Sequence, residues 1–297
     1  MKRNARIAGL VAAALVATGL STVALTSSAQ ARSSQANAVQ AHAVSAQTQA
    51  IADWHGAKPT IVLVHGAWAD AAGWTPVIER LEAAGFPVKA PPNPLRGLDS
   101  DAQFIHSVLE QIQGPVILVG HSYGGAVITN AVQGDPNVKA LVYIAAFAPA
   151  KGDSLAGLNG SQLGKTIPAL PVIATSYPNA DGTTGTELTI DPAHYPSVFL
   201  DNELPLDQEE ALAAEQRPLS LDAVTETSGT PAWQTIPSWY MVAKGDHAIA
   251  PALEEFMATR AHAHTVEVAG PHLIMLTNPG AVTDLIEQAA RTTARCD

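Results

Sequence analysis

A serine flanked by glycines occurs in the motif Gly120-His121-Ser122-Tyr123-Gly124, which matches G-x-S-x-G. A random match is expected in about one chain in ten of this composition, so the pattern alone is weak. Its context is stronger, because it directly follows the apolar run 115–119 and precedes a helical pattern. This arrangement is typical of a nucleophile elbow, a sharp strand-to-helix turn that exposes a serine hydroxyl. It favours Ser122 as a nucleophile over an incidental serine in a glycine-rich turn.

A serine hydroxyl is a weak nucleophile at neutral pH and needs a base within hydrogen-bond reach. His272 follows the last apolar run, 265–269, in a loop shaped by a glycine and a proline. The alternative for a lone loop histidine is simple exposure to solvent, but its place in the chain favours His272 as the base. His262 and His264 precede that run and would lie at the opposite edge of a sheet, and without a third ligand they are poor metal ligands.

An acid must orient the base, and it should follow the penultimate strand in the order serine, acid, histidine. Asp246 follows the apolar run 239–243 and fits that place. Held against the Nδ1–H of His272, it would select the tautomer and stabilise the imidazolium. Asp153, which follows the preceding run, is the alternative acid.

A tetrahedral oxyanion needs preorganised N–H donors. The backbone N–H of Tyr123, directly after the serine, is one candidate, and the N–H of Ala67, after the first apolar run, is the other. His65 and His121 flank these donors, and we expect them to hold the loops through hydrogen bonds.

Strand and helix patterns alternate from residue 59 onward, which predicts an α/β fold with a parallel sheet and right-handed crossovers. Six strands are expected, at residues 60–65, 87–90, 115–119, 140–145, 239–243 and 265–269. Helices are expected at residues 76–84, 100–113, 122–133, 251–260 and 278–293.

Residues 148–236 break the alternation with many prolines and glycines and one clear helix, 206–216. We expect this segment to be an inserted cap over the C-terminal edge of the sheet, where open α/β sheets bind ligands. Apolar residues that could line a substrate pocket there, or simply fill the core, are Trp68, Tyr123, Phe147, Leu158, Trp233 and Met275.

The composition excludes several classes of protein. The 297 residues are 47% hydrophobic and 14% charged, which is too apolar for a disordered chain, and a net charge of −11 without a basic patch argues against nucleic-acid binding. The single cysteine, Cys296, excludes an internal disulfide and a cysteine-rich metal site, and we expect no metal and no role for this thiol.

The N-terminus has the three parts of a secretory signal peptide. Lys2, Arg3 and Arg6 precede an apolar run from 7 to 25, and Ala29-Gln30-Ala31 supplies a cleavage site. A membrane anchor is the alternative, but the small residues and the cleavage site favour removal of residues 1–31. Residues 32–58 then form a flexible leader, and residues 59–297 form the α/β domain with its cap.

These motifs resemble the α/β-hydrolase superfamily, and in particular the branch of plant methylesterases, hydroxynitrile lyases and related bacterial esterases. The stretches that carry the resemblance are 65–68 with Gly73-Trp74, 120–125, 246–249 and 270–276. The resemblance spans about Pro59 to Ala290 and implies the α/β-hydrolase fold. In the lyases a lysine follows the base and a hydroxyl residue lies in the oxyanion loop, whereas this chain has Leu273 and Gly66. Both departures favour ester hydrolysis.

The sequence therefore predicts a secreted serine esterase that cleaves small to medium carboxylic esters without a cofactor. Its partner would be a small-molecule ester, with no nucleic acid and no stable membrane association after cleavage near Ala31. A hydroxynitrile-lyase-like or haloperoxidase-like activity on the same three residues is the alternative, and a catalytically silent binding module is a third hypothesis. The sequence leaves the acyl and alcohol specificity and the oligomeric state open.

Overall fold

The computed structural model describes residues 57–132 and 134–293, all within the structural unit Trp54–Asp297. The expected signal peptide, nearly all of the expected leader, and Cys296 lie outside the described residues. No helix in the described part of the chain is long and apolar enough to cross a membrane.

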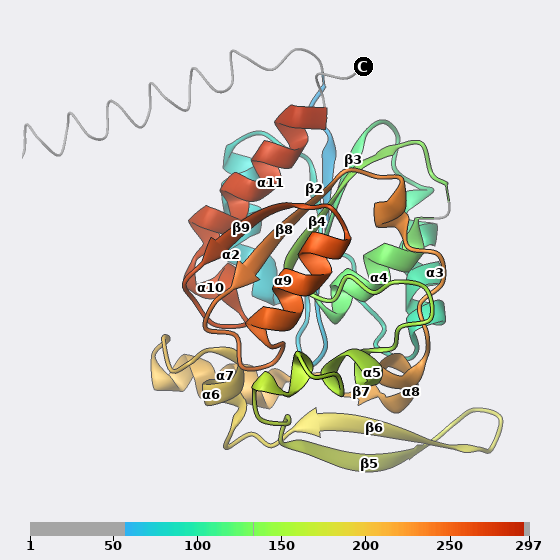
Figure 1. The fold of residues 1–297 in the computed structure, drawn as a ribbon, viewed down its shortest axis with the longest axis vertical. Coiled ribbons are helices and arrows are strands. Elements are labelled where there is room, and N and C mark those ends of the chain that lie inside the picture. Colours follow the sequence, from blue (N-terminus) through green and yellow to red (C-terminus); the bar gives the residue numbers. More distant parts are fainter. Residues whose placement is uncertain (1–56, 133, 294–297) are drawn as a thin grey trace, which may run out of the picture. The chain divides into compact units, whose positions relative to one another are not determined.

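A six-stranded parallel sheet forms the centre of this unit (Figure 1), which confirms the expected α/β fold. Its strands lie in the order β2-β1-β3-β4-β8-β9. Their bounds are β1 Thr60–Val64, β2 Val88–Lys89, β3 Val116–Ser122, β4 Val138–Ala146, β8 Ser238–Ala243 and β9 His264–Val268. All seven residues of β3 are buried, as expected for a central strand covered on both faces.

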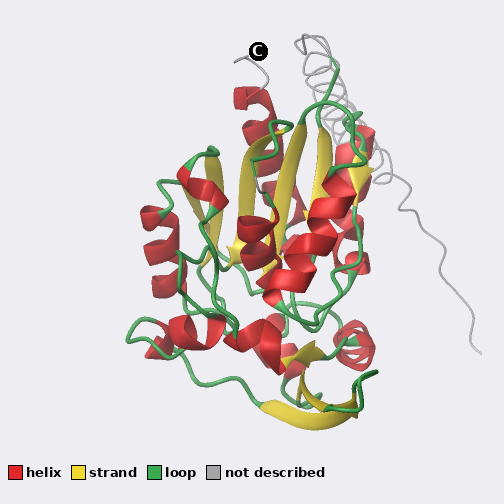
Figure 2. Cartoon of the chain, turned by 90° about the vertical axis from the view of Figure 1, so that its right-hand side faces the viewer, coloured by secondary structure: helices red, strands yellow, loops and turns green. Residues whose placement is uncertain are grey.

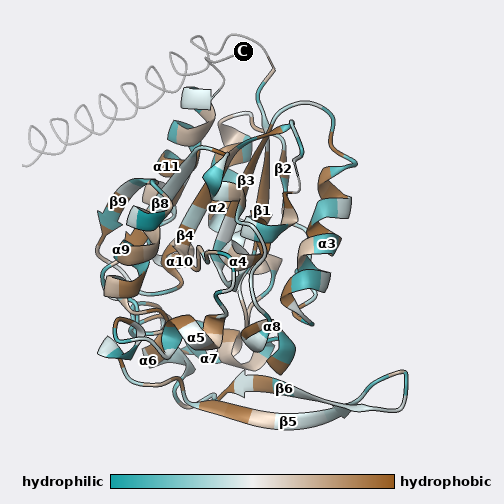
Figure 3. Ribbon diagram, turned by 45° about the vertical axis from the view of Figure 1, so that its right-hand side comes forward, coloured by the Kyte–Doolittle hydropathy of each residue, from teal (hydrophilic) through white to brown (hydrophobic). Residues whose placement is uncertain are grey.

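Helices cover both faces of the sheet, as Figure 2 shows. Their bounds are η1 Ala71–Trp74, α2 Thr75–Ala83, α3 Leu98–Leu109, α4 Tyr123–Ala131, α9 Pro251–Arg260, α10 Ile274–Thr277 and α11 Pro279–Thr293. The strand order reverses direction after β2, so right-handed crossovers place α2 on one face and α3, α4 and α9 on the other. Helix α11 packs against α2. Figure 3 shows the same layering by hydropathy. The central strands are brown, which marks apolar residues, and the helices outside them carry teal polar residues.

Most of the expected cap segment, residues 148–236, lies beyond one end of the sheet (Figure 1), whereas residues 232–234 pack against α4. The segment has more structure than the one helix expected. Its strands β5, β6 and β7 form a separate antiparallel sheet. The bounds are α5 Leu155–Asn159, η2 Gly164–Thr166, β5 Val172–Pro178, β6 Thr184–Ile190, α6 Tyr195–Phe199, α7 Leu206–Glu215, β7 Leu219–Ser220, α8 Leu221–Thr225 and η3 Ala232–Gln234. Strand β5 is largely exposed, so it lacks the buried apolar run that identifies a strand in a sequence.

Candidate active site

Ser122 is the last residue of β3, and α4 begins at the next residue. Its backbone has φ 53° and ψ −124°, a conformation that costs a non-glycine residue about 1–3 kcal/mol. The turn is tight because α4 passes close to β1: a Cβ at Gly124 would lie 2.4 Å from the carbonyl oxygen of Val64. The structure thus forms the strained strand-to-helix turn that the motif predicts.

His272 and Asp246 form a buried pair after the last two strands of the sheet. Nδ1 of His272 lies 2.5 Å from Oδ2 of Asp246, and each residue is 1% exposed. Oδ1 of Asp246 accepts hydrogen bonds from the N–H groups of Ala248 at 2.6 Å and Ile249 at 2.8 Å. These contacts fix the carboxylate, which in turn fixes the imidazole ring.

His121 joins this pair to the serine turn. Its Nε2–H donates to the carbonyl oxygen of His272 at 3.0 Å, and the two imidazole rings lie 4.7 Å apart. Burial and the neighbouring histidines lower the pKa of His121 well below its usual value, so this ring is neutral. A neutral ring allows the ring of His272 to carry a positive charge beside it.

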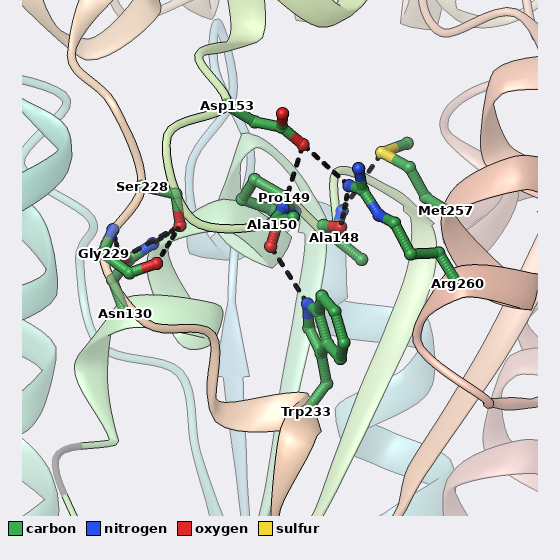
Figure 4. Close-up of polar contacts among 10 residues, drawn as sticks. All are labelled: Asn130, Ala148, Pro149, Ala150, Asp153, Ser228, Gly229, Trp233, Met257 and Arg260. Carbon is green, nitrogen blue, oxygen red and sulfur yellow. Dashed lines mark hydrogen bonds and ion pairs between the residues drawn. The ribbon is translucent and has the colours of Figure 1, made fainter.

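Asp153, the alternative acid, is engaged elsewhere. Its carboxylate pairs with Arg260 at 2.8 Å and accepts the N–H of Ala150 at 3.0 Å (Figure 4). It therefore stabilises the loop that leads from β4 into the cap. The rival histidines lie at the other end of β9 from the His272 loop, since that strand begins at His264.

His65 and His121 hold loops, as expected. Nδ1–H of His65 donates to the carbonyl oxygen of Gly66, and Nε2 accepts the N–H of Asn93, both at 2.9 Å. Since a proton on Nε2 would face another donor, this arrangement requires a neutral ring. Burial lowers the pKa of His65 to about 4, in agreement with these contacts.

A cavity of about 410 Å³ lies between the serine turn and the cap, a volume suited to a small organic ligand. Ser122 lines it together with Ala67 and Tyr123, the two residues whose N–H groups are the expected oxyanion donors. Its other lining residues are Trp68, Phe147, Leu155, Ala156, Asn159, Gly160, Gly164, Lys165, Ile167, Pro168, Ala169, Leu170, Val172, Leu188, Leu219, Val224, Ala248 and Ile249. Lys165 is the one charged side chain among these described residues.

Trp68 and Phe147 thus line the cavity, but three expected pocket residues do not. Leu158 and Met275 are 7% and 0% exposed, because their side chains belong to the hydrophobic core. Trp233 donates its indole N–H to the carbonyl oxygen of Pro149 at 3.0 Å (Figure 4). The prediction was wrong for these residues, because an apolar residue type does not specify which side of the backbone faces the cavity.

Two buried acids near the site were missed in the sequence. Asp101, in α3, accepts the phenolic O–H of Tyr123 at 2.8 Å and so fixes that side chain. Glu254, in α9, is completely buried beside Asp246. No motif marks either residue, since an acid on a helix usually faces solvent.

The residues described contain no cluster of three or more potential ligands placed to hold a metal ion.

The sequence profile of the alpha/beta hydrolase family matches residues 61–285 of the chain. The chain belongs to this family. The expected resemblance to this superfamily is therefore confirmed.

Similar proteins include esterases. A carbendazim hydrolyzing esterase of Nocardioides sp. (strain SG-4G) is 36% identical over 110 residues, which cover 33% of this chain and 46% of that protein. The match thus spans about half the length of that relative. Polyneuridine aldehyde esterase has a TM-score of 0.66 at 22% identity over 78% of this chain and 98% of its own. A methylesterase from Arabidopsis has a TM-score of 0.64 at 19% identity, over 79% and 99%. These two structural similarities establish the shared fold.

Proposed function

We propose that this alpha/beta hydrolase is a serine esterase that cleaves carboxylic esters through an acyl-enzyme on Ser122. One observation carries the proposal: a strained serine lines an apolar cavity, and His121 connects its turn to the buried His272–Asp246 pair. Esterase names among the similar proteins support the same class of reaction.

The first half of the reaction forms the acyl-enzyme. Nε2 of His272 takes the proton of Ser122, whose Oγ attacks the ester carbonyl carbon. The N–H groups of Ala67 and Tyr123 stabilise the oxyanion, at about 2.7–4 kcal/mol for each donor. The tetrahedral intermediate then expels the alcohol, which leaves with the proton from His272.

The second half releases the acid. His272 takes a proton from water, the hydroxide attacks the acyl carbonyl, and the proton returns to Oγ of Ser122 as the carboxylic acid departs. Asp246 remains a carboxylate throughout and keeps the proton of His272 on Nδ1. No cofactor enters these steps.

The cavity supports esters with a bulky apolar group on the acyl or alcohol side, because its lining is largely aliphatic and aromatic. The lyase alternative finds less support. Leu273, at the position of the lyase lysine, is apolar and 3% exposed, so it supplies no cation for a cyanide leaving group. We also propose that residues 1–31 direct export and are removed, so that the enzyme acts outside the cell without stable membrane association.

Hydrolysis of p-nitrophenyl esters of increasing acyl length, with the wild type and Ser122→Ala, tests the proposal. We expect Ser122→Ala to lose at least about 10³-fold in kcat and to resist labelling by a fluorophosphonate probe. Turnover of p-nitrophenyl acetate at the wild-type rate by this variant would refute the acyl-enzyme. Cyanide release from cyanohydrins without ester turnover would instead support the lyase.

A further inference from the structure

A second carboxyl group lies behind Asp246 and has no role in the steps above. Glu254 is in the first turn of α9, and its side chain is completely buried. Its neighbour Glu255 shows the usual position of a helical glutamate, with 41% of the side chain exposed and an ion pair to Lys244. A buried glutamate without a cation is rare, since burial of a charge is costly unless it is paired.

The hydrogen bonds of Glu254 indicate its protonation state. Oε2 accepts the N–H of Ala243, the last residue of β8, at 3.2 Å. Oε1 is buried and has no hydrogen-bond partner among the described residues. The carboxyl of Asp246 is close enough to act on that of Glu254 through its charge and through a hydrogen bond, so it is the acceptor available to a proton on Glu254. Two carboxylates cannot bond each other, so a bond between them requires a proton on one.

Asp246 is the less suitable place for that proton. Its two oxygens already accept the N–H groups of Ala248, Ile249 and His272, which favour the charged form. Glu254 accepts one N–H, so its charged form has much less support. The bond that satisfies both groups is therefore donated by Glu254 to Asp246.

The groups around α9 agree with a neutral Glu254. Those that act on it are the carboxyls of Asp246 and Glu255. The phenol of Tyr240 on β8 donates to the carbonyl oxygen of Ala146 and is close enough for Glu254 to raise its pKa. Burial, with the charge of Asp246 added, raises the pKa of Glu254 well above its usual value. The basic groups nearby have other partners or positions. Lys244 pairs with Glu255 and Glu267, and Arg260 pairs with Asp153. Lys165 of η2 lines the cavity.

We propose that Glu254 is a positioning residue, a carboxylic acid that donates a hydrogen bond to Asp246 and holds it as a carboxylate directed at His272. The inference rests on the proposed function for its catalytic consequence. A neutral Glu254 also means that the negative charge facing the imidazole of His272 comes from the carboxylate of Asp246 alone. The residue thus supplies alignment without adding negative charge behind the imidazole.

The protonation state is tested without any turnover. Infrared spectra of the wild type and Glu254→Gln at pH 7 in D₂O are subtracted from each other. We expect a carboxylic-acid C=O stretching band in the wild type that is absent from Glu254→Gln, while Glu255→Gln keeps it. Absence of this band from the wild type would overturn the proposal, whatever reaction the enzyme performs.

The positioning role is tested by kinetics. Glutamine retains both the acceptor for Ala243 and a donor for Asp246, whereas leucine retains neither. We expect Glu254→Leu to lose about tenfold or more in kcat with little change in KM, and Glu254→Gln to recover most of that loss. The acid limb of the pH profile of kcat/KM should be the same for wild type and Glu254→Gln.

Two results would overturn the role. A shift of that acid limb to lower pH in Glu254→Gln would show that Glu254 carries a charge, and this variant decides the matter even if Glu254→Leu does not fold. Wild-type kcat and pH profile in a folded Glu254→Leu would show that Asp246 needs no such donor. Failure of the proposed esterase is distinguishable, because it appears in the wild type and Ser122→Ala while the infrared result stands.

Discussion

Asp246→Asn should abolish most of the activity by reversing one hydrogen bond. The two backbone donors, at Ala248 and Ile249, require an acceptor at the Oδ1 position, so the asparagine must place its carbonyl oxygen there. Its NH₂ group then faces Nδ1 of His272, which lies 2.5 Å from Oδ2 in the wild type. Nδ1 must become an acceptor, and the ring proton moves to Nε2, where a base would need a lone pair.

The magnitude follows from the loss of the correct tautomer. A substitution of this kind in a serine–histidine–aspartate site lowers kcat by about 10⁴-fold, which corresponds to about 5.4 kcal/mol in the activation barrier. Since the side chain is completely buried, solvent does not replace the lost acceptor. We therefore expect a loss of this order in kcat, with KM changed by no more than a few-fold.

The assay is hydrolysis of a p-nitrophenyl ester at pH 7.5, with Asp153→Asn as the matched control. Asp153 pairs with Arg260 in the loop before the cap, so its substitution should leave kcat within about fivefold of the wild type. Near-ultraviolet circular dichroism checks that both variants are folded. Retention of more than about a tenth of the wild-type kcat by Asp246→Asn, or an equal loss in Asp153→Asn, would refute the assignment of the acid.

Three further predictions concern the serine turn, the cavity and stability at acid pH. A methyl group at Gly66 would lie 2.6 Å from Cβ of Ser122, so Gly66→Ala should displace the nucleophile and lower kcat/KM by about 10²-fold, whereas Gly280→Ala, where nothing lies within 4 Å, should not. Val224→Trp should fill part of the cavity, lowering kcat/KM about tenfold for bulky apolar esters while p-nitrophenyl acetate is cleaved nearly as before; equal losses for both substrates would contradict this placement. The pKa of His65 is lowered from 6.5 to about 4, so the unfolded state gains its proton first as the pH falls. The free energy of unfolding should therefore drop by on the order of 3 kcal/mol between pH 6.5 and 4, measured by urea denaturation, and His65→Gln should reduce this slope.

The central sheet could be predicted because its strands are buried on both faces. Runs such as 115–119 are apolar at successive positions, and glycine or proline marks their ends. The structure differs at the boundaries: β3 continues to Ser122, since its last residues still pair with β4. The hairpin of β5 and β6 was missed because β5 is almost entirely exposed and β6 is mostly half-buried, so neither forms a buried apolar run, and its turn is polar.

The order of the proposed nucleophile, acid and base along the chain, and the strand ends that carry them, are determined by the sequence itself. Ser122, Asp246 and His272 each follow an apolar run, and parallel strands bring their C-terminal ends to one edge. Tertiary structure alone decided that Trp233 supports a loop, that Asp153 pairs with Arg260, and that Glu254 is buried behind Asp246. The physical reason is that local pattern specifies which residues form an element, whereas the partners of a side chain come from segments far away in the chain.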